Sequence, residues 1–136
     1  MNIRLSEIKK LDRASVIRLY RSNKWSSAEK PEELMNALEN SHTLISAWDG
    51  DQLIGLANAI SDGILVVYYP HLLVLPEYQG KGIGRKIMKR MQEKYGKFHQ
   101  QILVADGRAI EFYSKCGFVK AGSCEPMWIY KGHDHD

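Results

Sequence analysis

An apolar repeat every four residues marks the clearest element in the chain. Its members are Ile83, Ile87, Met91 and Tyr95, and Lys, Arg and Glu residues fall between them. Apolar positions at this spacing lie on one face of a helix. The pattern therefore predicts an amphipathic helix from about Gly80 onward.

Upstream of this helix, the apolar pattern is typical of strands. Residues 43–48 and 52–60 flank the turn sequence Asp49-Gly50-Asp51, which predicts a β-hairpin. A second turn at 61–63 leads into residues 64–75, which we expect to form a long third strand. Pro70 lies within that strand and cannot donate a ladder hydrogen bond, so it predicts a bulge or a local separation from a neighbour.

Shorter patterns complete the order of elements. We expect a first strand at 2–8, helices at 11–20 and from Pro31, a strand at 101–105, a helix at 108–115, and closing strands at 118–119 and 127–130. This order predicts an α/β (mixed α+β) architecture rather than a regular doubly wound one. Because no repeat, low-complexity tract or linker divides the chain, we expect a single domain over residues 1–136.

Composition narrows the class of protein. The chain has 136 residues, of which 44% are hydrophobic, enough for the core of one domain. A net charge of +3 is too small to indicate a nucleic-acid partner. No apolar stretch has membrane-spanning length, and the first residues lack a secretory pattern. We therefore expect a cytoplasmic protein without a membrane partner.

The segment Gln79-Gly80-Lys81-Gly82-Ile83-Gly84 carries the candidate chemistry. Three glycines let a ligand approach the backbone, and the amide groups at the opening of the following helix would face a pyrophosphate. Lys81 and Arg85 add positive charge. The spacing fits neither a Walker loop nor the dinucleotide fingerprint. A tight glycine turn that serves only packing is the alternative.

Two motifs in this order resemble the GNAT acetyltransferase superfamily. The first is Leu72-Leu73-Val74-Leu75-Pro76-Glu77-Tyr78-Gln79-Gly80-Lys81-Gly82-Ile83-Gly84, and the second is Ala109-Ile110-Glu111-Phe112-Tyr113-Ser114-Lys115-Cys116-Gly117-Phe118. The resemblance implies a GNAT-like fold: a central, mostly antiparallel twisted sheet with a splayed strand pair, flanked by about four helices. It also implies acetyl-CoA as cosubstrate and no metal.

The resemblance also implies residue roles. The backbone of Leu73 and Val74 would pair with the pantetheine arm of acetyl-CoA. The pyrophosphate would rest on the amides of Gln79, Gly80, Lys81, Gly82, Ile83 and Gly84, with Arg85 nearby. Tyr113 would protonate the departing thiolate, which a phenol with a pKa of about 10 can do near pH 7. The alternative for Tyr113 is a core aromatic of a short helix.

The acceptor side is less clearly marked. His71 is the candidate base for the amine's proton, because a neutral imidazole can accept one at physiological pH. It could equally be a hydrogen-bonded core histidine. Tyr68 and Tyr69 are candidate lining residues or sheet aromatics, and Trp25 is a candidate substrate contact or a cap on the core.

The expected function is direct transfer of an acetyl group from acetyl-CoA to a primary amine in a ternary complex. The acceptor is a small molecule or a peptide amine. Alternatives are a non-catalytic acyl-CoA-binding sensor on the same fold and a protein Lys or N-terminal acetyltransferase. The segment 104–107 and Met127-x-x-Tyr130 show a weaker resemblance to the plant-type serotonin acetyltransferases. The wider family makes a homodimer a further expectation.

The last residues, His133-Asp134-His135-Asp136, have metal-ligand side chains but no companion cluster in the sequence. We expect no metal site there, because chain ends are usually solvated.

Overall fold

The computed structural model describes residues 2–133. Its elements follow in the order β1 (Ile3–Ser6), α1 (Arg13–Ser22), η1 (Ser26–Glu29), α2 (Pro31–Glu39), β2 (Thr43–Asp49), β3 (Gln52–Ser61), β4 (Val66–Val74), η2 (Pro76–Tyr78), α3 (Ile83–Tyr95), β5 (Gln100–Ile102) and α4 (Ala109–Lys115). The elements η1 and η2 are short 3₁₀ turns. This order confirms the mixed α/β class and the strongly periodic helix expected from residue 80 onward.

The five strands form one sheet in chain order, β1-β2-β3-β4-β5. Every pair is antiparallel except β4 and β5, which are parallel. Strand β5 pairs with β4 only from Val66 to Tyr68, whereas β4 continues to Val74. The second half of β4 therefore has a free edge among the described residues, which confirms the splayed strand pair.

Strand β4 is bulged at Pro70, as its sequence predicts. Tyr68 pairs with Ile60 and His71 pairs with Asn58, so three steps along β4 match two along β3. The backbone N–H of His71 donates to the Asn58 side-chain Oδ1 at 3.1 Å across this irregularity. Because of the extra residue, Tyr68 and His71 point to the same face of the sheet although they are three positions apart.

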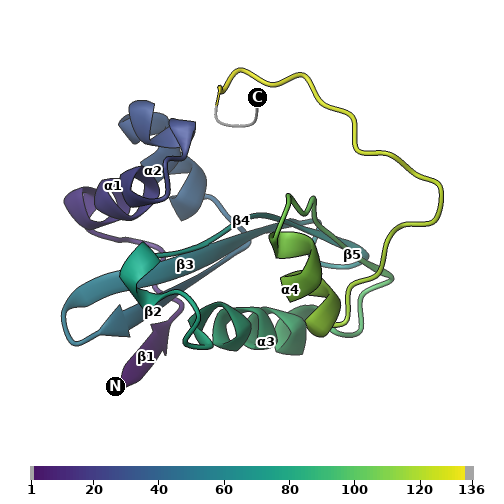
Figure 1. Cartoon of the computed structure of the whole chain (residues 1–136), viewed down its shortest axis with the longest axis horizontal. Helices are drawn as coiled ribbons and strands as arrows, with labels where there is room; N and C mark the ends of the chain where they lie inside the picture. The colour runs from purple at the N-terminus through teal and green to yellow at the C-terminus, as the bar shows by residue number, and fades with distance from the viewer. Residues whose placement is uncertain (1, 134–136) are drawn as a thin grey trace.

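Helices cover both faces of the sheet. Helices α1 and α2 lie on one side, and α3 and α4 on the other (Figure 1). The apolar face of α3 packs closely on β3, because a Cβ at Gly55 would lie 3.4 Å from the Ile87 Cδ1 atom. This packing fixes the start of α3 beside the end of β4, where the glycine segment lies.

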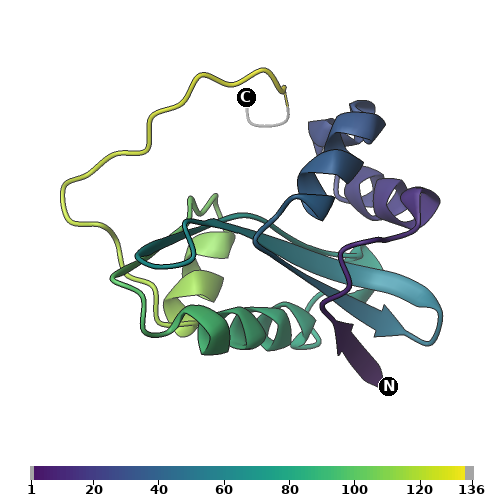
Figure 2. The same cartoon turned by 180° about the vertical axis from the view of Figure 1, so that it is seen from behind.

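The predicted closing strands at 118–119 and 127–130 are wrong. Gly117 turns the chain at a φ of 97°, and the following residues up to 133 form an extended arch without strand pairing (Figures 1 and 2). Val119, Met127 and Ile129 are 88%, 93% and 93% exposed. An alternating apolar pattern shows that a segment can form a strand, but pairing also needs an available edge, and β5 is only three residues long.

Candidate active site

Two glycines, Gly80 and Gly82, follow the splayed strand β4 and the turn η2. Gly80 and Gly82 have φ values of 77° and 82°, in the left-handed region that side chains disfavour. A Cβ built on either residue would meet no atom within 4 Å. Packing therefore does not explain these glycines. The backbone at Gly80 and Gly82 is therefore left-handed and has open space beside it.

The N-terminus of α3 continues this open surface. Its N-cap, Gly82, provides no side-chain hydrogen bond, and the first bond within the helix runs from the Lys86 N–H to the Gly82 carbonyl at 3.1 Å. The amides of Ile83, Gly84 and Arg85 thus have no intrahelical acceptor. They lie at the positive end of the helix dipole. Such an end is suited to bind an anionic phosphate group.

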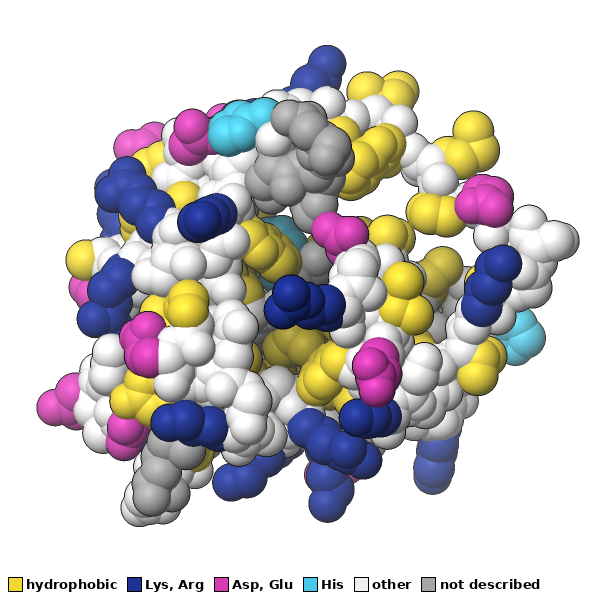
Figure 3. Space-filling model, viewed as in Figure 1, with side chains coloured by type: hydrophobic (Ala, Val, Ile, Leu, Met, Phe, Trp, Pro, Cys, Tyr) yellow, Lys and Arg dark blue, Asp and Glu magenta, His cyan; other side chains and the backbone are white. Residues whose placement is uncertain are grey.

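Positive side chains surround this helix end. Lys81 and Arg85 are exposed on either side of Gly82, and the Lys81 Nζ lies 5.7 Å from the centre of the Tyr78 ring. Figure 3 shows Lys and Arg side chains gathered along the lower edge of this view, over α3. The positive side chains and the orientation of the amides therefore both favour an anionic phosphate ligand.

Gln79 braces the end of the strand. Its side-chain Nε2 donates to the Val74 carbonyl at 3.0 Å and to the Asn23 Oδ1 at 3.1 Å. Its backbone N–H already donates to the Pro76 carbonyl at 3.2 Å. Of the amides predicted to bind pyrophosphate, the one at Gln79 is thus engaged within the protein, whereas those from Gly80 onward are not engaged in the described residues.

Along the second half of β4, the backbone N–H and C=O groups of successive residues point alternately toward β3 and toward the free edge. The Leu75 N–H donates to the Ile54 carbonyl at 2.7 Å, so by alternation Leu73 also faces β3. Leu72 and Val74 then face the free edge. The Val74 carbonyl additionally accepts from the Asn23 Nδ2 at 3.0 Å. Of the two residues predicted to pair with a ligand arm, Val74 points to the open side and Leu73 to β3.

Helix α4 packs against α3 and carries Tyr113. A Cβ at Gly84 would lie 3.3 Å from the Phe112 Cζ, so the lack of a side chain there lets α4 approach α3 closely. Tyr113 is half-buried, with its ring centre 5.9 Å from that of Phe118. Burial, with a smaller contribution from Cys116, raises the pKa of Tyr113 to about 12. The phenol therefore keeps its proton at neutral pH.

On the opposite face of β4, three aromatic side chains gather. The Tyr20 hydroxyl lies 2.7 Å from the His71 Nδ1, and the Trp25 ring meets the His71 ring edge-on at a centroid distance of 5.1 Å. Burial lowers the pKa of His71 to about 4, so the ring is neutral at pH 7. The sequence singled out His71 and Trp25, but it gave no signal for Tyr20 beyond a helical apolar position.

The two remaining predicted residues lie apart from this cluster. Tyr69 is 5% exposed and packs against Tyr95 and Phe118, while its hydroxyl donates to the Gln101 Oε1 at 2.7 Å. This is the position of a sheet aromatic. Tyr68 is exposed on the same face as His71.

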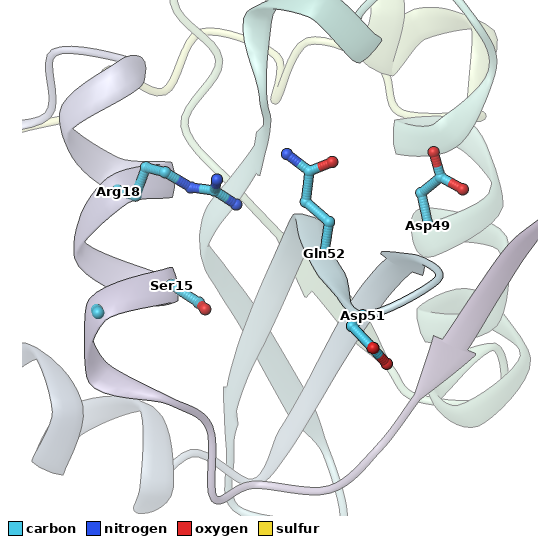
Figure 4. A pocket seen from close by; sticks show the side chains of 6 residues that line it. Ser15, Arg18, Asp49, Asp51 and Gln52 are labelled. Atoms are coloured by element: carbon cyan, nitrogen blue, oxygen red, sulfur yellow. The ribbon is translucent and has the colours of Figure 1, made fainter.

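A shallow polar hollow, which the sequence did not single out, lies between α1 and the β2–β3 hairpin. Its lining residues are Ala14, Ser15, Arg18, Asp49, Asp51 and Gln52. In Figure 4, the Arg18 side chain extends from α1 toward Gln52 on the hairpin. The Tyr78 hydroxyl donates to the Asp49 Oδ2 at 2.6 Å, so this hairpin also supports the segment that leads into the glycine loop.

Within residues 2–133, no group of three His, Cys, Asp or Glu side chains could hold a metal ion. His133 lies 2.7 Å from the Glu29 carboxylate, and Asp134, His135 and Asp136 lie outside the described residues. No helix in the described part of the chain is both long and apolar enough to cross a membrane.

The uncapped start of α3 next to a splayed strand is an arrangement suited to an anionic phosphate group. Residues 9–126 match the acetyltransferase (GNAT) domain family. The chain belongs to the GNAT acetyltransferase family, as its motifs predict.

Relatives and solved structures agree with this membership. A GNAT-family acetyltransferase from Streptococcus pneumoniae superposes with a TM-score of 0.84 at 30% identity, covering 96% of this chain and 99% of that one. An uncharacterized N-acetyltransferase from Prochlorococcus marinus is 28% identical over 84% of this chain and 66% of its own length. A spermidine N(1)-acetyltransferase from Vibrio cholerae is 26% identical over 82% of this chain and 70% of its own length.

The chain is shorter than several of these proteins. It spans 66% of the Prochlorococcus marinus relative and 27% of a chloroplastic GCN5-related N-acetyltransferase from Arabidopsis thaliana, which is 35% identical over 72 residues.

Proposed function

We propose that this chain transfers an acetyl group from acetyl-CoA to a primary amine, directly and within a ternary complex. The observation that carries the proposal is the uncapped start of α3 behind Gly80 and Gly82, beside the free edge of β4. These features together suit a ligand with a pyrophosphate and an extended amide-bearing arm.

The residues fit acetyl-CoA in two places. The amides of residues 80–85 would hold the pyrophosphate, with Lys81 and Arg85 as cationic neighbours. The backbone groups of Leu72 and Val74 on the free edge would pair with the pantetheine arm. Bound there, acetyl-CoA supplies an acetyl group activated as a thioester.

The protein's contribution to the reaction is mainly positioning and proton supply. The amine nitrogen bonds to the thioester carbonyl carbon, the carbon–sulfur bond breaks, and the amine loses one proton. Tyr113 donates its phenolic proton to the departing sulfur and is reprotonated from solvent. A phenol is protonated at neutral pH even at its ordinary pKa of about 10, and burial raises the pKa of Tyr113 further, to about 12.

The acceptor enters, in this proposal, from the face that carries His71, Trp25 and Tyr68. The relative from Vibrio cholerae is named for an amine acceptor, spermidine, which supports a small amine. A peptide amine uses the same chemistry. A cytoplasmic location and a homodimer stay predictions from the sequence.

The test is acetyl-CoA-dependent release of free thiol by the purified protein, across a panel of small amines and peptides. Turnover of at least one amine, at a rate proportional to enzyme concentration, supports the proposal. Binding of CoA in calorimetry without turnover of any amine would instead support the acyl-CoA-binding sensor. Absence of CoA binding contradicts both.

A further inference from the structure

The hydroxyl of Tyr20 has one available direction for its proton. Tyr20 is 0% exposed, and the His71 Nδ1, at 2.7 Å, is its hydrogen-bond partner. No buried side-chain nitrogen or oxygen among the described residues lacks a partner. If the Nδ1 carried a hydrogen and donated it, the Tyr20 proton would be buried without an acceptor, at a cost of about 1–3 kcal/mol. The Tyr20 hydroxyl is therefore the donor and the Nδ1 the acceptor.

This assignment fixes the other ring nitrogen. A neutral imidazole carries one proton, so the Nε2 must hold it when the Nδ1 accepts. His71 is half-buried, and its side-chain hydrogen bond is made by the Nδ1. Since no buried polar atom of the described side chains is unsatisfied, the Nε2 reaches solvent. The open side of the ring is thus an N–H donor.

The surroundings hold the ring in place. Trp25 packs edge-on against His71 at 5.1 Å and against Tyr20 at 5.7 Å. The backbone N–H of His71 is held by the Asn58 side chain at 3.1 Å. His71 directly precedes Leu72, whose backbone faces the free edge of β4. The donor therefore lies next to the path proposed for the pantetheine arm.

We propose that Tyr20 fixes His71 as a neutral imidazole with its proton on Nε2, and that this N–H donates to an oxygen atom of the acceptor substrate. His71 is then a substrate-positioning donor and not the base. The amine's proton passes to water. This inference rests on the proposed acetyl transfer, and it favours acceptors that carry a carbonyl or hydroxyl oxygen near the amine.

A base at this position would meet two obstacles. The Nε2 already carries a proton, and the Nδ1 is occupied by the Tyr20 hydroxyl. Protonation of the ring would also remove a charged group from water, and this burial lowers the pKa of His71 to about 4.

The first test measures the tautomer itself. Long-range ¹H–¹⁵N NMR correlations distinguish a protonated from an unprotonated ring nitrogen, and the His71 signals are assigned by their loss in His71→Gln. We expect a protonated Nε2 and a hydrogen-bonded, unprotonated Nδ1 at pH 7. In Tyr20→Phe the Nδ1 resonance should shift and a mixture of tautomers should appear. A proton on the Nδ1 in the wild-type protein would overturn the proposal.

The second test measures turnover. Glutamine keeps an N–H donor but cannot act as a base, whereas alanine has neither property. We expect kcat/KM for an oxygen-bearing amine to fall less than about tenfold in His71→Gln. In His71→Ala it should fall about 10- to 100-fold, mainly through KM of the amine. If His71 were the base, both variants would lose about 10²- to 10⁴-fold in kcat.

A matched control lies elsewhere on the sheet. The exposed His42 also places its Nδ1 against a tyrosine hydroxyl, that of Tyr95, at 2.6 Å. His42→Gln should leave kcat and KM unchanged.

If no amine is turned over by the wild-type protein, the proposed function fails, while the NMR result still decides the tautomer. A protonated Nε2 together with equal losses in the Gln and Ala variants would overturn the donor role.

Discussion

Burial favours the neutral forms of two side chains of the candidate site. It raises the pKa of Tyr113 to about 12 and lowers that of His71 to about 4. At pH 7 the site therefore offers a phenol that can donate and an uncharged imidazole. Neither state depends on a nearby ion pair. Both groups are therefore uncharged at pH 7 without the help of a neighbouring charge.

Replacement of Tyr113 by phenylalanine removes the proposed proton donor while keeping the ring. We expect kcat to fall by about 10²- to 10⁴-fold, the usual contribution of a general acid. The affinity for CoA, measured by calorimetry, should change less than about threefold, because the ring still packs against Phe118. A variant with full turnover would exclude Tyr113 as the acid and leave it as a core aromatic.

The lowered pKa of His71 makes stability sensitive to acid. Between the ordinary pKa of 6.5 and about 4, the unfolded chain binds a proton that the folded protein does not. Stability is therefore lost as pH falls through this window. Between pH 7 and pH 4.5, urea unfolding should show a loss in the wild-type protein about 2 kcal/mol larger than in His71→Gln. Equal losses in the two proteins would contradict the neutral, buried imidazole.

At the scale of elements, the bulge in β4 decides which side chains share a face. With regular alternation, Tyr68 and His71 would point to opposite sides of the sheet. The extra residue at Pro70 brings His71 to the side of α1, where Tyr20 lies. One irregularity thus connects the open strand edge with the aromatic cluster.

The start of α3 can be tested with a pair of glycines. Gly82 and Gly50 both have positive φ, 82° and 60°, and neither would bring a Cβ within 4 Å of another atom. Alanine at either position should cost a similar 1–2 kcal/mol of stability because of backbone strain. Only Gly82→Ala should weaken CoA binding, by about tenfold or more, since it places a methyl group at the proposed phosphate site. Equal CoA affinity in the two variants would show that the phosphate groups do not bind at the start of α3.

At the scale of the whole molecule, the chain beyond α4 adds little to the core. It arches away from α4 and reaches η1, where the Tyr130 hydroxyl lies 3.3 Å from the Ser26 Oγ and His133 contacts Glu29 (Figures 1 and 2). Both contacts are exposed, and exposed ion pairs contribute little. The main core lies between the sheet and its helices.

Truncation after Ala121 should therefore lower the free energy of unfolding by less than about 2 kcal/mol. Leu56→Ala, in the fully buried core, serves as the contrast and should cost about 2–5 kcal/mol. Urea denaturation of the three proteins decides between these values. A truncation as costly as the Leu56 variant would mean that the last residues pack on the core in solution.

The sequence alone determined the local elements and the glycine loop. The four-residue repeat of α3, the Asp49-Gly50-Asp51 turn and the proline bulge each depend on neighbouring residues, which a local pattern records. The positions of Gly80 and Gly82 also follow from local backbone geometry. The family motifs then predicted a role for Tyr113, and that role stays a prediction. For these features, short-range chemistry was sufficient.

Only the tertiary structure decided which distant groups meet. Tyr20 and His71 are 51 positions apart, as are Asn23 and Val74, and each pair comes together because α1 packs across the sheet. The failed prediction of strands after residue 117 has the same cause, since an apolar alternation does not specify a partner edge. Periodicity describes how a segment folds on itself. Contacts between segments depend on the packing of the whole chain, and at this site packing sets the tautomer of His71.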